Sequence, residues 1–97
     1  MEILSKIPIR LEAIEKEDID REILRAGIIA ELDAVNLYEQ MAAVTADKNL
    51  KTVLLDIAGE EKTHVGEFLA LLLEKDGEQR KELEEGKKEI KELTGKT

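Results

Sequence analysis

The sequence predicts an all-α fold, an antiparallel two-helix hairpin followed by a short C-terminal helix. Charged residues make up 39% of the chain and aromatic residues only 2%, a composition that favours long amphipathic helices over strands. Pro8 is the only proline, so no proline interrupts a helix in the rest of the chain. Apolar residues beyond it recur alternately four and three positions apart, which places them along one stripe of a helix.

Each predicted element has its own boundary signals. The first helix is expected over residues 17–45, and a short break follows in which Asp47 is a candidate N-cap. The second helix is expected over residues 48–75, and so short a connection makes the two helices antiparallel neighbours. Gly77 is expected to end the second helix, because glycine commonly follows a helix C-terminus. A highly charged third helix is expected over residues 78–93.

Length and composition limit the classes of protein that the chain can belong to. A chain of 97 residues is the size of one domain, and one this short leaves much apolar surface uncovered unless it finds a partner. The net charge of -8 argues against a nucleic-acid partner, since no basic surface is available for phosphates. No apolar run approaches the length of a membrane span and the start lacks a signal-peptide pattern, so we expect a cytoplasmic protein without a membrane segment. With no cysteine, any metal must be held by oxygen and nitrogen.

The two apolar stripes are each interrupted by polar residues near their middle. The stripe of the first helix comprises Leu24, Ile28, Glu31, Val35, Tyr38 and Ala42. The stripe of the second helix comprises Leu50, Leu54, Ile57, Glu61, His64, Phe68 and Leu71. In an antiparallel hairpin with a short turn the two middles lie at similar depth. The sequence therefore predicts that Glu31, Glu61 and His64 meet.

A divalent metal would compensate for burying these three polar residues. Without a partner, each buried ion destabilises the fold by on the order of several kcal/mol. Glu61 and His64 share a helix face, and carboxylate oxygen and imidazole nitrogen are metal ligands. Di-iron carboxylate bundles take one Glu from each of two helices and Glu-x-x-His from each of two others. The chain has one of each and a single histidine, so a complete site requires two copies about a twofold axis.

Other interpretations of these residues stay open at this point. Glu31 alone could form a salt bridge, and His64 alone could be a surface or hydrogen-bonded residue. Tyr38 is either a core aromatic or a hydrogen-bond or electron donor near the metal. The chain could also be a metal-free helical dimerisation module whose polar stripe residues fix the register, or it could bind manganese or zinc through the same ligands. The glycines within the first two predicted helices either permit close backbone approach or have no role; they are Gly27, Gly59 and Gly66.

At these residues the sequence resembles the encapsulated ferritin family, short two-helix relatives of ferritin that oxidise iron inside encapsulin nanocompartments. The resemblance rests on residues 31–35 (Glu-Leu-Asp-Ala-Val) with Tyr38, and on residues 60–62 (Glu-Glu-Lys) with His64. It implies a single ferritin-like domain over residues 1–97 that dimerises into a ferritin-like four-helix bundle.

The resemblance also implies an activity and partners. The expected activity is that of a ferroxidase, which oxidises Fe(II) to Fe(III) with dioxygen at a di-iron site, two irons per dimer. Glu31 and His64 would be terminal ligands, Glu61 would bridge the irons with its symmetry mate, and Tyr38 would assist catalysis. The expected assembly is a ring of five dimers inside an encapsulin shell, which would store the iron.

Two features differ from the family pattern. Ala30 stands where other members carry an acidic residue beside the ligand Glu31, which leaves Asp33 as the acidic neighbour for metal uptake. No shell-targeting tail follows Leu93. Because some members are fused directly to the shell protein, the chain is also compatible with a piece cut from such a fusion.

Overall fold

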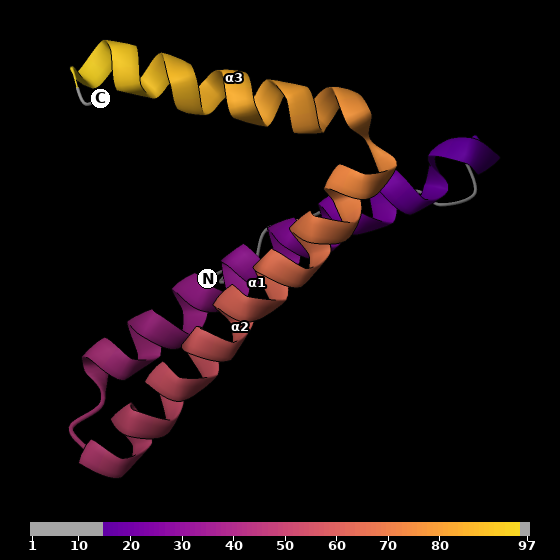
Figure 1. The fold of residues 1–97 in the computed structure, drawn as a ribbon. Coiled ribbons are helices and arrows are strands. Elements are labelled where there is room, and N and C mark those ends of the chain that lie inside the picture. Colours follow the sequence, from indigo (N-terminus) through magenta and orange to yellow (C-terminus); the bar gives the residue numbers. More distant parts are fainter. Residues whose placement is uncertain (1–14, 96–97) are drawn as a thin grey trace.

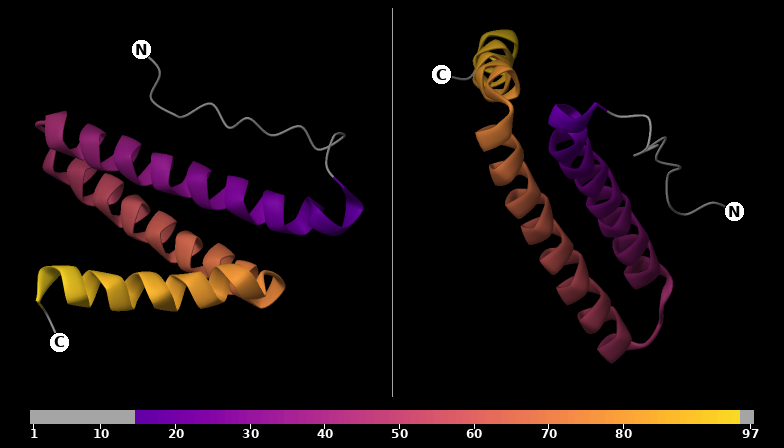
Figure 2. Two further views of the ribbon diagram at one scale, coloured as in Figure 1. Left: turned by 90° about the horizontal axis from the view of Figure 1, so that it is seen from above. Right: turned by 90° about the vertical axis from the view of Figure 1, so that its right-hand side faces the viewer.

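The computed structural model describes residues 15–95, and within this range it contains helices and no strand. A 3-10 turn, η2 (Lys16–Asp18), leads into α1 (Ile19–Val44), which is followed by α2 (Lys48–Lys75) and α3 (Gly77–Thr94). Helices α1 and α2 lie side by side and antiparallel, and α3 diverges from them at the far end of α2 (Figures 1 and 2). The predicted all-α hairpin with a third helix is therefore confirmed.

The observed helix limits differ slightly from the expected ones for local reasons. The expected start at residue 17 falls inside η2, so α1 begins at Ile19. Helix α2 ends at Lys75 as expected, because Asp76 breaks the helix with φ -133° and ψ 88°; Asp76 then caps α3, which begins directly at Gly77. The expectation of one domain over residues 1–97 includes residues outside the described range and stays a prediction.

The turn between α1 and α2 is set by hydrogen bonds of its own residues. The backbone N–H of Thr45 donates to the carbonyl of Met41 at 3.2 Å and closes α1. The side chain of Asp47 accepts from the backbone N–H of Leu50 at 2.8 Å and opens α2, as the sequence predicted. The Thr45 hydroxyl accepts from the Asp47 N–H at 3.2 Å, so cap and turn support each other.

The buried core follows one line along each helix, and on α2 this line departs from the predicted stripe. Buried apolar residues are Leu24, Val35 and Ala42 on α1, and Leu54, Ala58 and Leu72 on α2. Of the predicted α2 stripe, Leu50 and Leu71 are instead about half exposed. The reason is geometric: a straight helix drifts by about 20° per heptad against a 3.5-residue repeat, so a long heptad stripe cannot stay in one interface.

A single copy of the chain leaves a large apolar surface uncovered. Within residues 15–95, eleven large apolar side chains have exposed fractions between 36% and 84%: Ile23, Ile29, Leu32, Met41, Val44, Leu50, Val53, Leu55, Leu71, Ile90 and Leu93. A chain this short buries a smaller share of its apolar surface than a larger domain does, and a partner would cover more of it. No helix in the described part of the chain is apolar over a length that would cross a bilayer.

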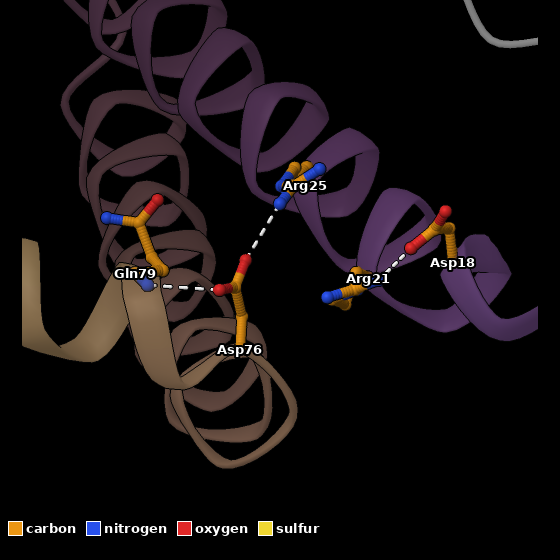
Figure 3. Close-up of polar contacts among 5 residues, drawn as sticks. All are labelled: Asp18, Arg21, Arg25, Asp76 and Gln79. Atoms are coloured by element: carbon orange, nitrogen blue, oxygen red, sulfur yellow. Dashed lines mark hydrogen bonds and ion pairs between the residues drawn. The ribbon is translucent and has the colours of Figure 1, made fainter.

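Asp76 forms the joint between the hairpin and α3 (Figure 3). Its backbone N–H donates to the carbonyl of Leu72 at 2.8 Å, and its carboxylate accepts from the backbone N–H of Gln79 at 3.0 Å. The second carboxylate oxygen accepts from Nη2 of Arg25 on α1 at 2.7 Å, and the Asp76 side chain is only 10% exposed. One carboxylate thus caps α3 and ties its start to α1.

The Asp76→Asn variant is expected to make the stability of the fold less sensitive to acid. The Gln79 N–H is the main group that holds the pKa of Asp76 below its ordinary value of 3.8; burial opposes this shift, and Arg25 and Arg21 add to it. A carboxyl group with a lowered pKa stabilises the fold above its unfolded pKa, and this contribution is lost as the pH falls from 3.8 through the folded value. Asparagine can still cap α3 but does not titrate.

Denaturation midpoints measured from neutral pH to below 3.8 would check this expectation. The wild type should lose more stability over the acid range than Asp76→Asn does. Equal losses in both proteins would mean that the Asp76 contacts contribute nothing to the pH dependence.

Candidate metal centre

The hairpin brings Glu31, Glu61 and His64 together near the middle of both helices. Glu31 projects from α1, while Glu61 and His64 lie one turn apart on α2 and share a face. One donor atom from each residue lies within 4.8 Å of the others. Nδ1 of His64 is 3.4 Å from Oε2 of Glu31 and 3.4 Å from Oε2 of Glu61. The predicted meeting of these three side chains is therefore present in a single chain.

The cluster sits in the α1–α2 seam but is open to solvent on one side. The side chains of Glu31 and Glu61 are 20% and 18% exposed, and that of His64 is 44% exposed. A hollow of about 420 Å³ lies beside them and is lined by Glu31, His64, Glu67, Phe68 and Leu71. Ions and a partner surface can both reach the donor atoms from this side.

The electrostatics of the cluster favour a cation. Within residues 15–95, no ion pair with lysine or arginine reaches Glu31 or Glu61; the neighbouring Lys62 pairs instead with Glu39 at 3.0 Å. Among the described residues, the two carboxylates therefore share one imidazole as their polar partner, and their mutual repulsion is relieved by an opposite charge between them.

The donor set fits a divalent metal but does not complete its coordination. Two carboxylates and an imidazole supply the oxygen and nitrogen ligands found in iron, manganese and zinc sites. One chain supplies three ligand residues, and its single histidine is already among them. A second copy presenting the same three residues would double the set to four carboxylates and two imidazoles.

The remaining candidate residues lie around the cluster and not in it. Tyr38 is partly buried on α1, one heptad beyond Glu31 or about 10 Å along the axis, and no hydrogen bond joins it to the cluster. Glu67 is exposed and lines the hollow, whereas the exposed Glu60 does not. Ala30 is exposed, so the position where the family resemblance implies an acidic residue faces solvent.

Of the three glycines within α1 and α2, Gly27 alone has a close neighbour. A Cβ atom at Gly27 would lie 3.2 Å from two ring atoms of Phe68, whereas one at Gly59 or Gly66 would meet nothing within 4 Å. From the sequence alone, no one of these glycines could be preferred over the others. The signal that could have singled out Gly27 is its position four residues before Glu31, opposite the aromatic residue four beyond His64.

An antiparallel helix pair that presents one Glu and one Glu-x-x-His supplies half of the ligand set of a ferritin-like di-iron carboxylate bundle. Comparison with known proteins gives the same class. The family model described as EncFtn-like matches residues 7–90, and the chain belongs to this family. The resemblance to encapsulated ferritins is thereby confirmed.

Relatives of known sequence and structure agree with this assignment. The chain is 62% identical over 80 residues to a ferritin-like-encapsulin shell fusion protein of Pyrococcus furiosus, and 38% identical over 56 residues to the encapsulin nanocompartment cargo protein EncC of Myxococcus xanthus. The crystal structure of the encapsulated ferritin domain from Pyrococcus furiosus superposes with a TM-score of 0.82 at 55% identity, covering 95% of this chain and 96% of that one.

The matched regions are parts of longer relatives. They cover 82% of this chain but 23% of the fusion protein, and 58% of this chain but 43% of the cargo protein. The chain thus spans less than half the length of either of these relatives.

Proposed function

We propose that the chain is a ferroxidase that oxidises Fe(II) to Fe(III) with dioxygen, at a di-iron site shared across a dimer interface. The observation that carries the proposal is the meeting of Glu31, Glu61 and His64 within 4.8 Å, without a lysine or arginine partner in the part of the chain that the structure describes. Dioxygen takes the electrons that Fe(II) loses.

The chain's own residues have defined parts in this proposal. Glu31, Glu61 and His64 would hold the two irons of a dimer together with the same residues of the second copy. The carboxylates favour the product, because hard anionic oxygen stabilises the extra charge of Fe(III). Tyr38 would act as a hydrogen-bond or electron donor, at a distance along α1 of about 10 Å from Glu31.

The need for a second copy has two independent supports. One chain holds three of the six ligand residues, and its exposed apolar side chains require cover. Dimerisation would turn two hairpins into a four-helix bundle with the iron site at its centre. A ring of five such dimers is the assembly that the family resemblance implies.

The proposed partner beyond the chain itself is an encapsulin shell. One relative is named as a fusion to such a shell and the other as its cargo. Iron oxidised by this chain would then be stored within the shell, and the chain would lie inside the nanocompartment in the cytoplasm. The family resemblance implies no storage cavity within the bundle, which suits this division of tasks.

Assembly is expected to depend on metal, because cations relieve the repulsion among four carboxylates brought together at the interface. Light scattering after size-exclusion chromatography should give a monomer mass with chelator, and dimer or larger masses with Fe(II) under anaerobic conditions or with calcium. Glu60→Gln is a matched control, since Glu60 is an exposed neighbour of Glu61 and should leave this shift intact. The same mass with chelator and with Fe(II) would contradict a shared site.

The second candidate function is a metal-free dimerisation module. It is favoured by the contacts of His64, which lies 3.4 Å from one oxygen of each carboxylate and could fix the register of a helix pair. Metal analysis of protein purified without added iron separates the two candidates. It also distinguishes iron from manganese or zinc.

A further inference from the structure

The ring of Phe68 lies directly against the backbone of Gly27. A Cβ atom at Gly27 would be 3.2 Å from ring atoms Cδ2 and Cε2 and 3.4 Å from Cζ. Contacts of 3.2 Å are closer than the great majority of those made by real Cβ atoms. A side chain at residue 27 would therefore require the ring to move by a few tenths of an ångström.

This contact is one helical turn from the metal cluster on both helices. Gly27 precedes Glu31 by four residues on α1, and Phe68 follows His64 by four residues on α2. Residues four apart lie on one face of a helix, so the ring contact and the Glu31–His64 contact are successive steps across the same seam. Phe68 also lines the hollow that Glu31 and His64 line.

We propose that Gly27 and Phe68 form a spacer that sets the separation of α1 and α2 at the metal cluster and so positions His64 against Glu31. Both are positioning residues, since neither offers a donor atom to a metal. The inference deepens the proposed function and rests on it. Metal ligands must be held within about 0.5 Å of their productive positions. An aromatic ring in direct contact with backbone atoms limits how closely the two helices can approach each other.

The other two helix glycines make the assignment specific. Alanine is a better helix former than glycine, so a glycine within a helix needs a reason or is neutral. Gly59 and Gly66 have open space where a side chain would go, and no contact requires their glycine. They are therefore matched controls for a Gly→Ala change in the same hairpin.

The test is a titration of the full chain with Co(II), followed by visible absorption, at one protein concentration throughout. Gly27→Ala should bind Co(II) at least about 10-fold more weakly than the wild type, comparable to losing a group that orients a ligand. Gly59→Ala and Gly66→Ala should keep the wild-type affinity while raising the unfolding temperature by roughly 4–8 °C through helix propensity. Affinity in Gly27→Ala equal to that of the two controls would overturn the inference.

A double-mutant cycle separates positioning from general damage to the fold. Phe68→Leu removes the ring from the other side of the contact and should also weaken Co(II) binding. In Gly27→Ala/Phe68→Leu the new methyl group occupies space that the ring has left, so affinity should return toward the wild-type value. Losses that simply add in the double variant would contradict a spacer made by these two residues.

A readout without metal keeps this inference distinct from the proposed function. In metal-free protein, the imidazole NMR shifts of His64 should change in Gly27→Ala and stay unchanged in Gly59→Ala. Equal Co(II) binding by wild type and His64→Ala would refute the proposed metal site, and the NMR comparison would still decide the spacer. Unchanged His64 shifts in Gly27→Ala would refute the spacer even where the metal site is sound.

Discussion

The His64→Ala variant is expected to lose Fe(II) oxidation by more than about 100-fold while keeping its helix content. Loss of a group that merely orients a metal ligand costs about 10–100-fold, and loss of the ligand itself should cost more. His64 is the only histidine, so one substitution removes both nitrogen ligands from a dimeric site. Its side chain is 44% exposed, which limits the packing lost on truncation.

Stopped-flow absorbance of Fe(III) after mixing with Fe(II) and air-saturated buffer measures the rate, and circular dichroism measures the helix content. Thr63→Ala is the matched control. Its side chain is exposed on the same turn of α2 and donates only to the backbone carbonyl of Gly59, at 3.4 Å. Oxidation at the wild-type rate in His64→Ala would assign the histidine a structural role.

The local features of this fold could be predicted because they are determined by a few neighbouring residues. The Asp47 cap and the short turn placed α1 and α2 as antiparallel neighbours. With that arrangement fixed, equal distance from the turn was enough to bring Glu31 against Glu61 and His64. The position of a residue along a hairpin follows from the number of residues between it and the turn. The meeting of these three side chains could therefore be predicted from the sequence.

Features that depend on how a helix is rotated about its axis were not predictable from residue counting. Ala58 and Leu72 are buried instead of the neighbouring positions of the predicted stripe. The reason is that a heptad stripe turns gradually about the axis of a straight helix. The Arg25–Asp76 contact joins residues 51 positions apart, through a joint where a simple helix end was expected. The approach of Phe68 to Gly27 likewise requires the rotation of both helices to be known.

Glu31→Ala is expected to separate the metal site from the interaction module more sharply than any other change to the cluster, because the two functions give it opposite consequences. If Glu31 is a metal ligand, its carboxylate is held near a second carboxylate in order to bind the metal. Within the described residues, its only partner is His64. Its removal from metal-free protein should then be neutral or stabilising, by up to about 2 kcal/mol. As a residue that fixes register through His64, it should destabilise on removal, by roughly 1–3 kcal/mol.

Thermal unfolding of wild type and Glu31→Ala, each with chelator and with anaerobic Fe(II), decides between these outcomes. A ligand at 100 times its Kd stabilises a folded protein by about 2.7 kcal/mol, so the wild type should gain stability of this order from Fe(II). Glu31→Ala should lose most of that gain, together with metal-driven assembly, although it is at least as stable as the wild type with chelator. Destabilisation of equal size in both conditions would remove Glu31 from the ligand set, because a contribution that is independent of metal belongs to the protein contact alone.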